Sequence, residues 1–106
     1  MVKRFEIFMV NLDLEPSDDP KNTRPCVIIS PDELNRNIDN VIVAPLSSVS
    51  RRYPTRIPID FLNGKRAIVL DQIRTVDKIR LVKKIGEIER KAGVEVLARL
   101  QEMFAE

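Results

Sequence analysis

The sequence predicts a mainly β chain, folded as a small, strongly curved sheet or barrel with a C-terminal helix. Short runs of apolar, often β-branched residues recur between clusters of turn-forming residues, which is the pattern of buried strands. From position 90 onward the apolar residues change to helical spacing. The length of 106 residues suits one independent domain. We therefore expect residues 1–106 to form a single domain.

The turn signals define the strands. The expected strands cover residues 5–12, 24–30, 41–46, 55–60, 67–70 and 83–88. Pro58 assigns the strand at 55–60 to a sheet edge, because proline has no N–H for a second neighbour. The Asn63-Gly64 pair favours a tight hairpin turn after that strand.

The remaining segments are a loop, a short helical turn and the terminal helix. Residues 13–23 are rich in Asp, Pro, Asn and Ser and read as a loop. At residues 30–35 a short helix is expected, with Ser30 as its N-cap and Pro31 at the first helical position. The expected apolar face of the last helix comprises Val94, Leu97, Leu100, Gln101 and Phe104, widened by Ala98 and Met103.

Composition removes most catalytic machinery. The chain has no histidine and one cysteine, so it cannot build a Ser-His or Cys-His dyad or a His/Cys zinc site. A metal site made of carboxylates alone remains possible. Cys26 lies in an apolar run and is expected to be a small buried hydrophobe. The net charge of +2 permits a nucleic-acid partner without requiring one.

No targeting or membrane segment is evident. The apolar runs are much shorter than the roughly 18–20 residues that a membrane span needs. The first residues carry charge but no long apolar region or cleavage site. We therefore expect a cytoplasmic protein without a membrane partner.

One pair of strands carries the most chemistry. The run at 41–46 ends in two hydroxyl residues, Ser47 and Ser48, and the strand at 24–30 begins with Arg24 before a proline. If these strands pair, Arg24 and the hydroxyls face one cleft. On the residues alone, Arg24 can equally be a surface or ion-pairing residue, and the serines can be turn formers.

Five segments, in this order, carry a family resemblance: 3–10 (KRFEIFMV), 23–29 (TRPCVII), 41–48 (VIVAPLSS), 53–55 (YPT) and 69–77 (VLDQIRTVD). On these segments the chain resembles the MazF/PemK family of toxin endoribonucleases, or mRNA interferases, from type II toxin–antitoxin modules. The resemblance implies an SH3-like barrel of the MazF/Kid/CcdB kind that forms a homodimer. It also implies metal-independent, sequence-specific cleavage of single-stranded RNA by its 2′-hydroxyl, leaving a 2′,3′-cyclic phosphate and a 5′-hydroxyl, with no cofactor. The implied partner is a MazE-like antitoxin, with DNA contacted only indirectly through it.

The resemblance assigns roles to single residues. Arg24 matches the family's catalytic arginine, Ser47 its catalytic hydroxyl residue and Ser48 a frequent second hydroxyl. Glu6 and Asp71 match acidic positions linked to RNA binding or proton handling. Arginine suits the main role, because its planar fork of fixed donors fits phosphate oxygens and stays charged.

Further residues are expected to support RNA binding: Asp18, Asp19, Arg51, Arg52 and Tyr53. The candidates for the general base are Glu6, Asp19 and Asp71. For Arg74 we favour a structural ion pair with Asp71.

The chain also departs from the family pattern. Phe5 replaces a usual glycine, and residues 17–20 (SDDP) replace the usual loop motif, where Asp18 would repel phosphate.

Two other functions compete with RNA cleavage. A non-enzymatic toxin of the same fold would resemble the gyrase-poisoning CcdB family, whose C-terminal Trp-Gly-Ile end differs from the Met103-Phe104-Ala105-Glu106 end of this chain. A plain SH3-like module would bind protein segments, and substitution of Arg24 would leave that binding untouched.

Overall fold

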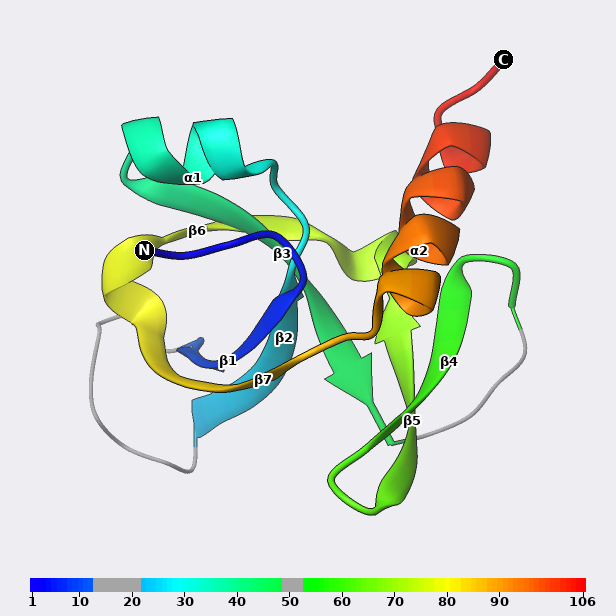
Figure 1. Ribbon diagram of the computed structural model, residues 1–106, viewed down its shortest axis with the longest axis horizontal. Helices are drawn as coiled ribbons and strands as arrows, with labels where there is room; N and C mark the ends of the chain where they lie inside the picture. Colours follow the sequence, from blue (N-terminus) through cyan, green and yellow to red (C-terminus); the bar gives the residue numbers. More distant parts are fainter. Residues whose placement is uncertain (13–21, 49–52) are drawn as a thin grey trace.

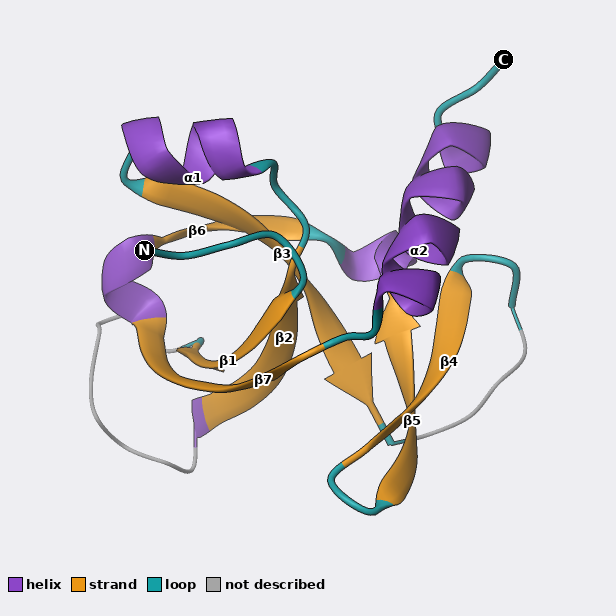
Figure 2. Cartoon of the chain, in the orientation of Figure 1, coloured by secondary structure: helices purple, strands orange, loops and turns teal. Residues whose placement is uncertain are grey.

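The computed structural model describes residues 1–12, 22–48 and 53–106. Within them the chain forms a curled antiparallel sheet with two α-helices, so the predicted mainly β fold with a terminal helix is confirmed (Figures 1 and 2). The strands are β1 (Glu6–Asn11), β2 (Thr23–Ile28), β3 (Asn40–Ser47), β4 (Arg56–Phe61), β5 (Gly64–Val69), β6 (Arg74–Asp77) and β7 (Leu81–Glu87). The helices are α1 (Asp32–Asn37) and α2 (Arg90–Met103), and short 3-10 turns cover Leu70–Gln72 and Lys78–Arg80.

Strand β3 is the centre of the sheet. The strand order is β4-β5-β3-β2-β1-β7, and β6 also pairs with β3. Along its length β3 pairs with β6 through residues 40–43, with β2 through 43–45 and with β5 through 46–47. One strand thus has three neighbours, which curls the sheet. Val41, Val43 and Ala44 are fully buried, as the apolar run predicts.

The sheet is covered on both faces. Ile7, Val27 and Ala44 belong to a cluster that α2 closes with Val96. The alternate residues of the same strands, including Cys26 and Val43, belong to a second cluster with Val76. Because successive side chains of a strand point to opposite faces, β2 and β3 contribute to both cores. Their unbroken apolar runs follow from this double burial.

Helix α2 lies beside β4 (Figure 1), but its buried face differs from the expected one. Gly93 and Val96 are buried, whereas Val94 and Phe104 are 61% and 71% exposed. Ala98 and Gln101 are exposed as well, so the predicted stripe was wrong for Val94, Ala98, Gln101 and Phe104. The reason is Gly93, which lies against the ring of Phe5 and which apolar periodicity cannot register.

Ser30 does not cap α1. The helix begins after Pro31, and its N-cap makes no side-chain hydrogen bond. The Ser30 hydroxyl instead donates to Asn35 Oδ1 at 2.5 Å and accepts the Ile42 N–H at 3.0 Å. Both Ser30 and Asn35 are buried, so this pair joins α1 to β3. The N-cap expectation was wrong because a buried backbone N–H of β3 competes for the same hydroxyl.

Strand β4 is an edge strand, as Pro58 predicts. It pairs only with β5, through a two-residue turn in which Leu62 and Asn63 have φ of 52° and 57°. Both values lie in the left-handed region that such turns require. Gly64 already belongs to β5, opposite Phe61. The turn therefore begins one residue earlier than the Asn-Gly pair suggests.

Candidate active site

Arg24 and Ser47 lie at the same end of the β2–β3 pair. Cys26 pairs with Pro45 and Val27 with Ala44. Arg24 lies two residues before Cys26, and Ser47 lies two residues after Pro45, where β3 pairs with Ala67 of β5. Strand alternation puts both on the face that carries Cys26 and Pro45. Arg24 is exposed and Ser47 is half-buried. The predicted pairing of these strands is observed, whereas the catalytic roles of the two residues remain predictions.

A cavity of about 270 Å³ opens on this face. It is lined by Leu12, Arg24, Cys26, Val43, Pro45, Gln72 and Arg74. Arg24 enters from β2, and Arg74 enters from β6, where it pairs with Val43. No carboxylate of the described residues lines the cavity, so its charged lining consists of the two arginines, beside the apolar Leu12, Val43 and Pro45. Such a site favours an anion, because arginine donors match phosphate oxygens in pairs.

Arg74 is the residue that the sequence reasoning assigned wrongly. We expected it to pair with Asp71, but Asp71 Oδ1 lies 3.5 Å from Arg56 Nε and accepts the Thr55 hydroxyl at 2.9 Å. In the described part of the chain Arg74 has no carboxylate within ion-pair distance. The spacing within the 69–77 segment gave no signal for this, because β6 turns Arg74 toward the cavity by pairing with β3.

Cys26 forms part of the cavity floor and is chemically quiet. Burial raises the pKa of its thiol to about 11, and the charges of Arg74 and Arg24 offset this only in part. The thiol is therefore neutral at physiological pH and is not a thiolate nucleophile. Both arginines therefore lie close enough to lower the pKa of the same thiol.

Asp71 anchors a polar cluster beside the cavity. Burial raises the pKa of its carboxyl, but hydrogen bonds from Thr55 and Arg56 outweigh this, and the pKa falls below its usual value. Asp71 is thus ionised at neutral pH. The Arg56 guanidinium also stacks on the Tyr53 ring, 4.9 Å from its centroid. In sequence, Asp71 directly precedes Gln72, which lines the cavity.

Glu6 lies apart from the cavity. It is at the opposite end of β1 from Val10, which pairs with Arg24, and four residues of strand span about 13 Å. Its carboxylate is buried and accepts bonds from Lys84 Nζ and the Lys3 N–H, both at 2.6 Å. The structure therefore gives Glu6 a structural ion pair between β1 and β7.

The ion pair predicts a pH dependence of stability. Burial raises the pKa of Glu6, but the bonds from Lys84 and Lys3 lower it by more than burial raises it. The pKa therefore lies below its ordinary value of 4.5. Glu6 therefore stabilises the fold fully above about pH 4.5, and this contribution is lost as the pH falls through the lowered pKa. In urea denaturation from pH 7 to pH 3, we expect Glu6→Gln to be less stable by about 1–2 kcal/mol at pH 7 and to approach the wild type at pH 3. A difference that stays constant with pH would contradict this.

The other predicted residues divide into two groups. Ser48 is exposed directly after β3, and Tyr53 is 48% exposed. Asp18, Asp19, Arg51 and Arg52 lie outside the described residues.

Neither α-helix of the described chain is long and apolar enough to cross a membrane.

The sequence and the fold correspond to a known class of small toxins. Residues 3–104 match the family of PemK-like, MazF-like toxins of type II toxin–antitoxin systems. The chain is 30% identical over 102 residues to an endoribonuclease MazF of Staphylococcus epidermidis, covering 91% of this chain and 85% of that protein. A second endoribonuclease MazF, from Staphylococcus saprophyticus, is 31% identical over the same coverage.

Solved structures show the same fold. The Mycobacterium tuberculosis toxin MazF-mt6 superposes with a TM-score of 0.79 at 22% identity, over 93% of this chain and 95% of that one. A MazE–MazF structure from Deinococcus radiodurans has a TM-score of 0.80 at 18% identity, over 98% of this chain and 95% of that chain. The chain belongs to the PemK-like, MazF-like toxin family, which confirms the resemblance drawn from its motifs.

Proposed function

We propose that this protein is an endoribonuclease toxin that cleaves single-stranded RNA at short sequence motifs in the Arg24–Arg74 cavity. The observation that carries the proposal is that Arg24 and Arg74 line one cavity together with apolar residues. Strand alternation from Pro45 puts Ser47 on the same face of β3. Two relatives, 30% and 31% identical to this chain, are named endoribonuclease MazF, which supports the same function. An RNA phosphate would lie between the two arginines.

The proposed reaction uses the nucleophile that RNA carries itself. The 2′-hydroxyl gives up its proton and its oxygen attacks the adjacent phosphorus, while the bond to the 5′-oxygen breaks and that oxygen takes up a proton. A 2′,3′-cyclic phosphate and a 5′-hydroxyl end result. The transition state gains negative charge on the phosphoryl oxygens, which Arg24 and Arg74 stabilise. Ser47 donates a hydrogen bond to one of these oxygens. The cavity holds the backbone so that attacking and leaving oxygens lie in line.

Asp71 supports the site without being assigned the role of base. Its carboxylate is ionised but already accepts from Thr55 and Arg56. It orients Arg56, and Arg56 in turn fixes Tyr53 by stacking. The ring of Tyr53 is half exposed, so its free surface can stack on a base next to the cleaved phosphate.

The direct test is cleavage of a long single-stranded RNA in EDTA. We expect cuts at one short motif, mapped by sequencing of the product ends. The 2′,3′-cyclic phosphates should resist alkaline phosphatase until mild acid opens the ring to a monophosphate. No cleavage of any RNA would overturn the proposal, and DNA gyrase would then be the target to assay. Cleavage restored only by added metal ions would contradict the 2′-hydroxyl reaction as we propose it.

The proposed partners are an antitoxin and a second copy of the chain. The solved structures similar to this chain include MazE–MazF of D. radiodurans and a mycobacterial endoribonuclease with its cognate antitoxin, which support a MazE-like antitoxin here. For self-association, the flank of α2 carries the exposed side chains of Val94 and Phe104. A second copy would bury them.

Substitution on this flank tests the homodimer. At micromolar concentration we expect the wild type to have the mass of a dimer by light scattering and Val94→Asp to have the mass of a monomer, because burying an unpaired charge opposes association. Ile38→Asp is the matched control, since Ile38 is a 42% exposed apolar residue at the end of α1. A wild-type monomer, or a dimer that Val94→Asp leaves intact, would count against this surface.

A further inference from the structure

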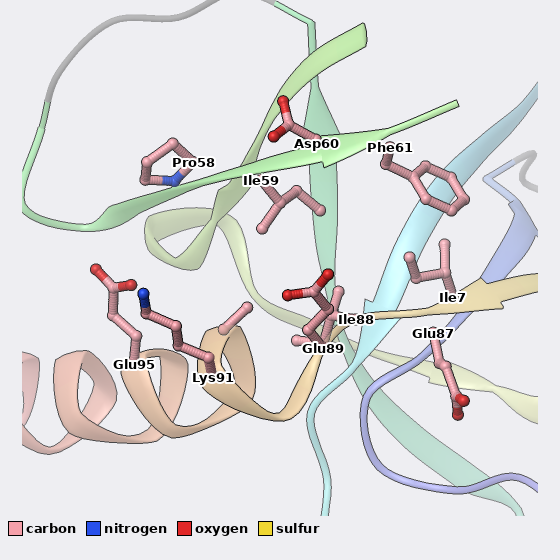
Figure 3. Close-up of a pocket in the computed structure, with 11 residues that line it drawn as sticks. Ile7, Pro58, Ile59, Asp60, Phe61, Glu87, Ile88, Glu89, Lys91 and Glu95 are labelled. Atoms are coloured by element: carbon pink, nitrogen blue, oxygen red, sulfur yellow. The ribbon is translucent and has the colours of Figure 1, made fainter. Parts of the chain in front are cut away.

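A second cavity lies on the face of the sheet opposite the two arginines. It has a volume of about 480 Å³ and is bounded by β4, the end of β7 and the first turns of α2 (Figure 3). Its apolar lining includes Ile7, Ile59, Phe61 and Ile88, all of which belong to or pack on the core cluster closed by α2. The arginine cavity shares Cys26 and Val43 with the other cluster. The sheet therefore separates the two cavities.

The charge of this cavity is opposite to that of the first. Figure 3 shows the carboxylates of Glu89 and Glu95 directed into the space between β4 and α2, with Lys91 beside Glu95. Glu89 is the N-cap residue of α2, but its side chain caps nothing. In the described chain neither carboxylate lies within ion-pair distance of a basic group. Asp60, by contrast, points away and pairs with Lys65 at 3.0 Å.

The free edge of β4 runs along the same cavity. Phe61 and Gly64 flank the two-residue turn and form a hydrogen-bonded pair, so Ile57 and Ile59 also bond to β5. The main-chain groups of Pro58 and Asp60 then point away from β5. Both residues line the cavity. The Asp60 carboxylate points away from the cavity, so it is the main chain of Asp60 that faces the cavity. The Pro58 carbonyl and the Asp60 N–H and carbonyl are thus available to a further strand.

We propose that this cavity and the β4 edge bind an extended, cationic peptide segment of a protein partner. The segment adds to β4 as an antiparallel or parallel strand. One of its side chains facing the cavity is apolar and fills the floor between Ile59 and Phe61. The next side chain on that face, two residues along, is a lysine or arginine that pairs with Glu89 or Glu95. An acidic segment is excluded by the same two carboxylates.

Binding here leaves the arginine cavity open, because the sheet lies between the two sites. The segment and RNA therefore bind at the same time, and the proposal does not depend on the proposed ribonuclease activity. A partner held in this way can stay attached to the toxin while RNA is bound. Loss of one function through substitution at its own cavity leaves the other intact.

The probe is a fluorescent octapeptide, Thr-Leu-Thr-Arg-Thr-Leu-Thr-Arg, blocked at both ends, whose extended form presents leucine and arginine on one side. We expect a saturable rise in anisotropy with the wild-type protein and none with the peptide in which glutamate replaces arginine. Glu89→Gln together with Glu95→Gln should weaken binding by roughly two- to thirtyfold, as expected for two exposed ion pairs. The matched control is Glu33→Gln with Glu106→Gln, two exposed carboxylates outside the cavity, which should leave binding unchanged.

Three results would overturn the proposal. They are the absence of saturable binding, equal binding by the glutamate peptide, and equal weakening by the control pair. The last result would mean that only the total charge of the protein attracts the peptide.

Strand addition is tested with two peptides methylated at alternate amides, one on the threonines and one on the leucines and arginines. One of them should lose binding and the other keep it, because only alternate N–H groups face β4. If both bind as well as the parent, strand addition is wrong.

Discussion

Arg24→Ala is expected to reduce RNA cleavage by at least roughly a hundredfold, because it removes one of two charges that would stabilise the phosphoryl transition state. Arg74→Ala should cause a loss of similar size, since both side chains line the same cavity. Arg24→Lys should restore only part of the rate, because an ammonium cannot reproduce the two-pronged contact of a guanidinium. The measurement is the single-turnover rate on an RNA that contains the mapped cleavage motif.

The control for these variants is Arg36→Ala on α1, which removes another exposed arginine that does not line the cavity. It should cleave at the wild-type rate. Thermal unfolding should be nearly unchanged in Arg24→Ala, because the side chain is exposed. If Arg24→Ala and Arg36→Ala cleave equally well, the arginine cavity is not the active site.

The largest expected effect on stability is at Gly93. A Cβ at this position would lie 2.5 Å from Cε2 and 2.7 Å from Cδ2 of the Phe5 ring. Gly93→Val is therefore expected to destabilise the fold by about 2–3 kcal/mol, because the added side chain forces the Phe5 ring or α2 to shift. The midpoint of thermal unfolding should fall by roughly 10–20 °C, as measured by circular dichroism.

A double-mutant cycle with Phe5 isolates the contact. Phe5 has a φ of 75°, in the left-handed region that glycine adopts without strain. In the Phe5→Gly background the ring is gone, so Gly93→Val should cost much less than it does in the wild type. Ala98→Val is the control on the exposed side of α2 and should change stability by less than about 1 kcal/mol. Equal costs of Gly93→Val in both backgrounds would contradict the assigned clash.

The same contact explains why the sequence predicted the helix but not its buried face. Apolar periodicity finds side chains, whereas the close approach of α2 depends on the absence of one at Gly93. In the sheet, the apolar runs of β2 and β3 were recognisable because both strands are buried on two faces, and Pro58 correctly indicated an edge. Here the local pattern and the tertiary structure agree.

The candidate site was predictable only where adjacent strands carry it. Arg24 and Ser47 could be brought together from sequence, because a β2–β3 pairing follows from their patterns. Arg74 could not, since its direction depends on β6 pairing with β3 after a 3-10 turn. The neighbours of Asp71 were missed for the same reason: Thr55 and Arg56 reach it through the β4–β5 hairpin.

The position of β1 between β2 and β7 has a consequence for synthesis of the protein. Strand β1 is synthesised well before its second neighbour, which spans residues 81–87. This part of the sheet can close only once residues 81–87 have been synthesised, and contacts so distant in sequence form slowly. Until then β1 exposes the edge that β7 later covers, so the order of the strands leaves an unpaired strand edge on the growing chain.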